Sequence, residues 1–221
     1  MAEKYGTIPP KFTVAWFDYV WTYYKWHIII PLAVILFTLV TMYQCTHRPQ
    51  YDAELIYAGH VVFSDDQTDE IPLGLARYVD DVNGDGEQTV FFQQINFSDE
   101  PGTEEMDYNM QMKLDLQFQR GETFLFMYDK YETDIMIARE SAELIYLPVT
   151  EWADTMPDAD KLYSKDGVPY AVSLANNQKI KDIGINTDDI YLTLRINYSD
   201  SDDIALKYEN AKKLANALIS E

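Results

Sequence analysis

Cysteine and histidine are scarce in this 221-residue sequence. Cys45 is the single cysteine, so no internal disulfide can form and no CxxC pair exists. There are three histidines, His27, His47 and His60. The sequence also lacks the G-x-S-x-G, H-E-x-x-H and phosphate-binding-loop patterns. We therefore expect a protein that is not an enzyme and that carries no cofactor.

Positive charge is the second shortage. The chain has 17 Lys and Arg against 37 Asp and Glu, and residues 49–221 hold 13 of the basic and 35 of the acidic side chains. A surface of this kind repels nucleic acid and anionic lipid headgroups, which excludes nucleic acid as a partner. It attracts cations or a basic partner, although solubility alone also explains an acidic surface.

One long segment has no charge at all. Residues 27–46 (HIIIPLAVILFTLVTMYQCT) contain no Asp, Glu, Lys or Arg. The 18 residues from Ile28 to Cys45 would extend about 27 Å as a helix, close to the hydrocarbon thickness of a bilayer. Pro31 lies near the start of the run, where a missing N–H costs least or a kink is tolerated. The preceding segment, WFDYVWTYYKW, is aromatic and predicts an interfacial belt. We expect a transmembrane helix with the lipid bilayer as its partner.

The flanking charges predict how this helix is oriented. Lys4, Lys11 and Lys25 precede the apolar run, whereas Arg48 alone follows it closely. This bias predicts a cytoplasmic N-terminus and an extracellular C-terminal part in the cell membrane. No A-x-A-like cleavage site follows the run, and the residues before Cys45 are not the small ones that lipoprotein processing needs. An uncleaved signal anchor is the interpretation that fits.

The remaining pattern predicts one α/β domain. We divide the chain into an aromatic segment at 1–26, a transmembrane helix at 27–46, a linker at 47–52 and an extracytoplasmic domain at 53–221. Within the domain, strands alternate with helices, which predicts a mixed, largely parallel sheet. The expected strands are 53–58, 89–97, 124–128, 144–148, 169–174 and 189–196. The expected helices include 65–79, 130–140, 176–183 and a final amphipathic helix from 204.

Residues 104–119 fit two patterns. Met110, Met112, Leu114, Leu116 and Phe118 alternate with polar residues, which is typical of a strand. Met106, Met110, Leu114 and Phe118 also form an i, i+4 stripe, and Arg120-Gly121 would end a helix. The abundance of Met, Leu, Gln and Lys favours the helix.

The segment DVNGDG resembles the first half of a calcium loop. Asp81, Asn83, Asp85 and Gly86 occupy positions 1, 3, 5 and 6 of such a loop, which makes Asp81, Asn83 and Asp85 candidate calcium ligands. The acidic ligand expected at position 12 is absent, since Phe92 stands there. A turn of Asn, Asp and Gly between a helix and a strand explains the segment better.

Two resemblances carry further expectations. The strings YYKWHIIIP, IPPKFT, DVNGDG, EWAD and DGVPYAVSL resemble uncharacterised single-pass membrane proteins of Clostridia-type Firmicutes. The order of FQRGETFLFMYD, AELIYLPVTEWAD and DGVPYAVSL resembles one lobe of an extracellular solute-binding protein that serves ABC transporters. This second resemblance implies a periplasmic-binding-protein-like fold and a ligand site near the strand ends. The candidates for that site are Tyr128, Asp129, Trp152 and Tyr170, for which packing in the core or in turns is the alternative.

These observations lead to two hypotheses of different kinds. The first is a membrane-anchored accessory, sensing or assembly module without enzymatic activity, with a membrane or cell-surface protein as its partner. The second is a membrane-tethered solute-binding protein for a sugar or peptide, linked to a transporter. Solute-binding proteins hold their ligand between two lobes, and about 170 residues suffice for one.

Overall fold

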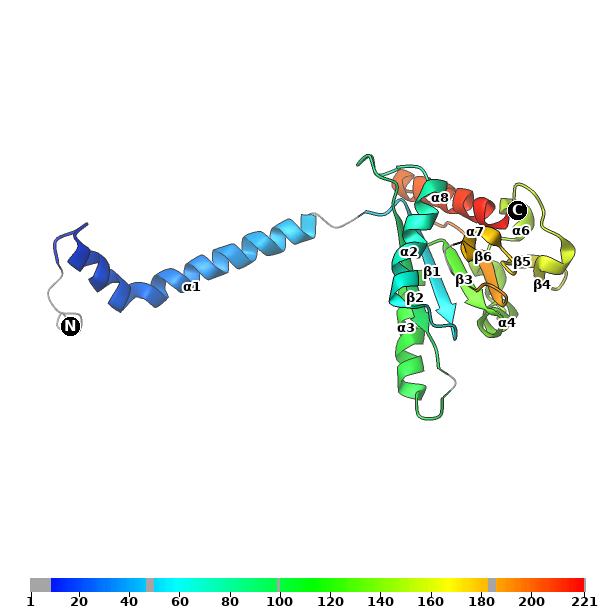
Figure 1. Ribbon diagram of the computed structural model, residues 1–221, viewed down its shortest axis with the longest axis horizontal. Helices are drawn as coiled ribbons and strands as arrows, with labels where there is room; N and C mark the ends of the chain where they lie inside the picture. Colours follow the sequence, from blue (N-terminus) through cyan, green and yellow to red (C-terminus); the bar gives the residue numbers. More distant parts are fainter. Residues whose placement is uncertain (1–8, 47–49, 99, 183–185, 221) are drawn as a thin grey trace. The chain divides into compact units, whose positions relative to one another are not determined.

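The computed structural model describes residues 9–46, 50–98, 100–182 and 186–220. The chain divides into two compact units, 1–50 and 51–221 (Figure 1). Lys4 and Arg48, two of the residues on which the predicted orientation depends, lie outside the described residues.

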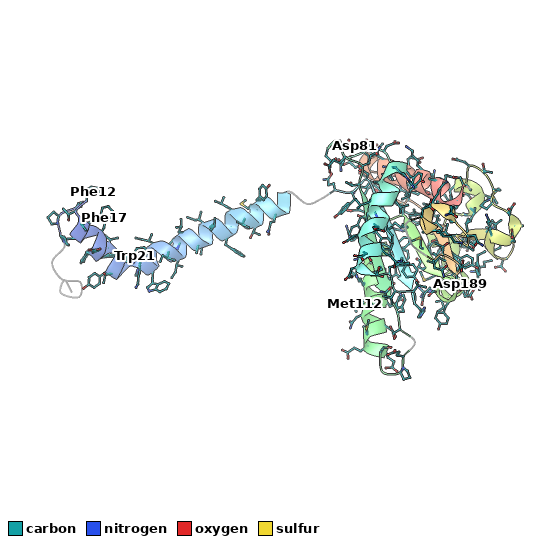
Figure 2. All side chains as sticks on the ribbon, viewed as in Figure 1. Phe12, Phe17, Trp21, Asp81, Met112 and Asp189 are labelled. Atoms are coloured by element: carbon teal, nitrogen blue, oxygen red, sulfur yellow. The ribbon has the colours of Figure 1, made fainter. Side chains whose placement is uncertain are left out.

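The first unit is a single long helix. Helix α1 covers Val14–Thr46, and its apolar stretch is long enough to cross a membrane. It begins before the apolar run, so the aromatic segment belongs to the same helix. Phe17 and Trp21 are more than half exposed and stand out from the ribbon (Figure 2). Pro31 is therefore interior to the helix, not at its start, and it removes the N–H that would bond to the carbonyl of His27.

The second unit is an α/β domain built on one mixed sheet of six strands in the order β2-β1-β3-β6-β5-β4. Strand β1 pairs in parallel with β2 on one side and β3 on the other. The pairs β3–β6, β6–β5 and β5–β4 are antiparallel, so parallel pairing is confined to one end and covers less of the sheet than expected. The strands are β1 Ala53–Gly59, β2 Val90–Asn96, β3 Leu125–Asp129, β4 Leu162–Lys165, β5 Val168–Ser173 and β6 Ile190–Leu194.

Helices cover both faces of this sheet (Figure 1). One face is covered by α2, α6, α7 and α8, which bury residues such as Leu75, Trp152 and Leu214. The other face is covered by α3, α4 and α5, which bury Leu114 and Met136. The helices are α2 Asp65–Leu75, α3 Glu104–Arg120, α4 Lys130–Ala138, α5 Ala142–Ile145, α6 Val149–Trp152, α7 Gln178–Lys181 and α8 Asp202–Ile219, with short 3-10 turns at Ala76–Tyr78 and Ala159–Lys161.

Residues 104–120 form a helix, which decides between the two patterns of the sequence. In α3, Leu114 is buried and Phe118 packs on the core, while Met112 and Leu116 are about half exposed. The alternating strand would have buried those two side chains as well. Gly121 ends the helix in the left-handed conformation, with φ 73°.

One expected strand is wrong. The segment 144–148 contains the end of the short helix α5 and then a single bridge between Tyr146 and Arg195. On either side of this bridge, the N–H of Leu147 donates to the carbonyl of Leu194 and the N–H of Ile196 donates to that of Ile145. Tyr146 is fully buried and Leu147 packs against the core, whereas Leu144 is 63 % exposed, so the apolar run reflects packing of part of the segment and not a strand.

Candidate functional site at the ends of the parallel strands

The topology of the sheet defines one place where a site is expected. The chain leaves β1 toward β2 at the edge, then returns past β1 to form β3 on its other side. The connections after β1 and β3 therefore run in opposite directions, which opens a crevice outside the carboxyl ends of these two strands. Gly59 and His60 lie at the end of β1, and Asp129 lies at the end of β3.

Asp129 organises this crevice with both of its carboxylate oxygens. Oδ1 accepts a hydrogen bond of 2.8 Å from the backbone N–H of Glu132, which makes Asp129 the N-cap of α4. Oδ2 accepts a bond of 2.6 Å from the backbone N–H of His60. Nδ1 of the His60 ring lies 2.8 Å from the same oxygen. One carboxylate thus ties the start of a helix to the end of the neighbouring strand.

Gly59 makes this arrangement sterically feasible. A Cβ atom at position 59 would lie 2.7 Å from Oδ2 of Asp129 and 2.5 Å from the hydroxyl of Tyr57. Real Cβ atoms essentially never come so close to other heavy atoms. The Tyr57 hydroxyl also accepts a hydrogen bond of 2.9 Å from the N–H of Val61. Glycine is therefore needed here for close approach.

A hollow of about 410 Å³ opens beside this pair. Its lining comes from four segments: the chain after β1, the chain after β2, the start of α3 and the first turns of α4. The residues that matter chemically are His60, Glu104, Asp107, Tyr108, Tyr131 and Glu132. The rings of His60 and Tyr131 meet edge to face, with 5.1 Å between their centroids. The size is that of a small-ligand site, and the lining is mainly acidic and aromatic.

Glu132 is the most unusual charge in this hollow. Its side chain is only 6 % exposed, and burial, followed by the nearby charge of Asp129, raises the pKa of its carboxyl group. Among the residues that the structure describes, none forms a hydrogen bond or an ion pair with this carboxylate. A buried carboxylate without a partner is costly, and such groups concentrate at functional sites.

The four residues proposed from the solute-binding resemblance are not gathered in one place. Asp129 lies in the crevice, as described. Tyr128 is fully buried, with its hydroxyl 2.9 Å from that of Tyr146. Trp152 packs in the core on one face of the sheet, while Tyr128 and Tyr170 pack on the other. Of the four, Asp129 alone lies beside the hollow, where it contacts the lining residues His60 and Glu132.

The proposed calcium ligands lie on a tight loop whose polar atoms bond to its own backbone. Asp81 accepts bonds of 2.6 Å from Gly84 N–H and 2.9 Å from Gly86 N–H. Asn83 accepts from the N–H of Asp85, and Asp85 accepts from that of Glu87. Within the described ranges, no three His, Cys, Asp or Glu side chains are placed to hold a metal ion.

Two residues of the hollow were not selected from the sequence. The sequence patterns place His60 after an apolar strand and Glu132 in a helix, but they predict no role for either. A signal for both was present: Gly-His directly follows an apolar strand, and Asp129 directly follows another and precedes a helix. Side chains at the carboxyl ends of neighbouring parallel strands converge.

The chain was also compared with known proteins. No protein-family model, curated protein or solved structure matches it. The role of the hollow is therefore inferred from the residues that line it.

Proposed function

We propose that this chain is a bitopic membrane protein whose acidic C-terminal domain acts outside the cytoplasm as a non-enzymatic sensing, accessory or assembly module. The observation that carries this proposal is the hollow at the ends of β1 and β3, where Asp129 joins two neighbouring strands and Glu132 lines the wall. A small concave site at a topological switch point is suited to recognition. The apolar helix α1 supplies the membrane anchor.

The orientation of the anchor has its own test. We expect the domain on the outside, because Lys4, Lys11 and Lys25 precede the apolar run. In a Cys45→Ser background, a cysteine introduced by Asp166→Cys at the hairpin turn should react with a membrane-impermeant maleimide in intact cells. A cysteine introduced by Ala2→Cys should react only after permeabilisation. The reverse labelling would invert the orientation.

The hydrogen bonds around the hollow support the proposal that the domain has no enzymatic activity. His60 and Asp129 form a His–carboxylate pair of the kind that orients catalytic histidines, and Ser98 lines the same hollow. The Ser98 hydroxyl, however, accepts a bond from the N–H of Glu100, and its hydrogen bonds to described residues do not include His60. A fluorophosphonate probe should leave Ser98 unmodified. Labelling that is lost in Ser98→Ala and His60→Ala would contradict the proposal.

Recognition itself is tested by crosslinking from within the hollow. Tyr108 lines the hollow and is largely exposed, so a photoreactive amino acid at position 108 should capture the partner protein in intact cells. Leu206 is half exposed on α8, against the other face of the sheet, and gives the matched control position. Capture at 108 that disappears in Asp129→Ala supports the proposal. Equal capture at both positions, or neither a captured partner nor a stabilising solute, would contradict it.

A second candidate function is a membrane-tethered solute-binding protein linked to a transporter. It is favoured by the position of the hollow at the strand ends and by the periplasmic-binding-protein-like order of motifs described above. Because the domain is a single lobe, a closed cleft would need a second copy of the chain. Sugars and peptides should then raise the unfolding temperature and promote dimers, measured by native mass spectrometry. Stabilisation without any change in mass would argue for an open, one-lobe site.

A further inference from the structure

Glu132 is a buried residue whose carboxylate forms no hydrogen bond or ion pair with a described residue, although the nearby His60 and Arg139 act favourably on its charge. Its backbone N–H is bonded to Asp129, so the position of the residue in the first turn of α4 is fixed. The residue lines the hollow and is only 6 % exposed, and its carboxylate has no hydrogen-bond or ion-pair partner among the described residues. A buried carboxylate in this state gains a large amount of free energy when a donor or a cation reaches it.

The other acidic groups around the hollow already accept hydrogen bonds, including the exposed Glu104, which accepts one of 3.4 Å from the N–H of Gly102. Asp107 accepts hydrogen bonds from the N–H of Ser98 and from the hydroxyl of Thr103. Asp129 accepts three, from His60 and from Glu132. These carboxylates add negative potential without needing a ligand of their own. Glu132 differs from them because the residue is buried and its carboxylate accepts no hydrogen bond from a described residue.

The aromatic part of the lining restricts the ligand further. Tyr131 and Tyr108 are 59 % and 64 % exposed, and both line the same hollow. Aromatic faces near a carboxylate favour an organic cation, because the ring quadrupole attracts positive charge and the ring covers its apolar part. A bare divalent ion instead requires several converging oxygen ligands, and no such group of three side chains occurs in the described part of the chain.

We propose that the hollow binds the ammonium group of a small organic amine, with the Glu132 carboxylate accepting its N–H donors and Tyr108 and Tyr131 flanking its carbon atoms. This inference rests on the proposed function, since it names the chemistry that the recognition site accepts. A primary ammonium group fits better than a quaternary one, because the carboxylate requires N–H donors. The strongly acidic domain adds a favourable long-range potential for such a ligand.

The test uses the full chain in phosphatidylcholine nanodiscs and isothermal titration calorimetry. The probes are n-butylamine and putrescine, with 1-butanol as the uncharged isostere, tetramethylammonium as the cation without N–H donors, and Ca²⁺ and Mg²⁺. We expect both amines to bind at least tenfold more tightly than 1-butanol and tetramethylammonium. Equal binding of amine and alcohol, or a preference for the metal ions, would overturn the inference.

The decisive variant is Glu132→Gln, which keeps the shape of the side chain and removes its charge. It should weaken amine binding at least tenfold. Glu143→Gln removes the same charge from an exposed position on α5 and should change the affinity less than twofold. Equal effects of the two variants would reduce the role of Glu132 to general electrostatics and would overturn the proposal.

A measurement on the unaltered chain guards against a variant that fails to fold. Because the ammonium group stabilises the ionised form of Glu132, binding at acidic pH should release protons, and the heat should change with the ionisation enthalpy of the buffer. Binding without proton release would count against Glu132 as the partner. If sugars or peptides bind and amines do not, the amine inference fails and the proposed function stands; if neither a solute nor a partner protein binds, both fail.

Discussion

The carboxylate of Asp129 occupies the space that any side chain at position 59 would need. The distance from a Cβ at Gly59 to Oδ2 of Asp129 would be 2.7 Å, and the Tyr57 hydroxyl would be closer still. Two strands that are neighbours in the sheet but 70 residues apart in the chain therefore constrain each other at their carboxyl ends. The candidate site is built on this contact.

Gly59→Ala should destabilise the domain through this contact. The added methyl group forces apart the Asp129 carboxylate and the buried Tyr57 ring, and overpacking of this kind costs about 1–3 kcal/mol. Urea unfolding of the full chain measures the loss. The double variant Gly59→Ala/Asp129→Gly should be destabilised by less than the sum of the two single variants, because removing the carboxylate relieves part of the clash. Full additivity would show that the two positions are independent.

Asp129→Ala should loosen both the start of α4 and the end of β1. The variant loses the N-cap of α4 and the acceptor for the His60 N–H, which together cost about 2–3 kcal/mol. Asp115→Ala, on the exposed side of α3, should stay within about 0.5 kcal/mol. Hydrogen exchange at the His60 and Glu132 amides should accelerate in Asp129→Ala alone. Unchanged protection at both amides would remove Asp129 from its organising role.

Glu132 should make stability depend on pH in a defined direction. Burial raises the pKa of its carboxyl group above the ordinary value of 4.5, and the nearby Asp129 and Asp107 raise it further. His60 and Arg139 act in the opposite direction and lower this pKa. The buried, neutral Tyr57 and Tyr128 also face the group. The folded state therefore binds more protons than the unfolded state just above pH 4.5, and this contribution to stability is lost as pH rises through the folded-state pKa.

The variant Glu132→Gln removes this dependence. Its free energy of unfolding should exceed that of the unaltered chain at pH 7.5, and the difference should vanish near pH 4. Urea unfolding across this range measures both curves, with Glu143→Gln as the exposed control, for which the curves should coincide. A difference that grows toward acidic pH would mean that the carboxylate is stabilised in its ionised form.

Asp52 should matter more for the loop 81–87 than the candidate calcium ligands do. It is fully buried and accepts bonds from the N–H groups of Val82, Asn83 and Thr89. Asp52→Ala strands these donors and should cost about 3 kcal/mol or more. Asp81→Ala should cost less than about 1 kcal/mol, because water replaces an exposed acceptor. Thermal unfolding in the presence and absence of calcium measures both variants, and a smaller loss for Asp52→Ala would contradict this ranking.

Local patterns predicted most of the elements of the domain. The stripe Ala211, Ala215 and Leu218 in α8 is buried, and Ile204 and Tyr208 pack beside it, as its spacing predicted. Asp166-Gly167 is a residue pair typical of a two-residue hairpin turn, and it joins β4 to β5 with both residues at positive φ. Such features depend on neighbours within a few residues, so the sequence records them directly.

Local sequence patterns do not predict contacts between segments that are distant in the chain. The i, i+4 spacing of Glu209 and Lys213 favours an ion pair between them. In the structure, Glu209 pairs with Lys212, and Lys213 pairs with Asp80 from another part of the chain. The proposed ligand residues Trp152 and Tyr170 both lie in apolar segments of the sequence. The pleat of the sheet and the helix connections place them on opposite faces of the sheet.

The sequence by itself determined the features that depend on composition and local order. These are the uncharged helical run from residue 27, the acidic character of the rest, and the alternation of strands and helices. Only the tertiary structure decided that His60 and Glu132 line one hollow beside Asp129. The reason is that a parallel crossover brings strand ends together across some 70 residues, and the burial of Glu132 is a property of the assembled layers.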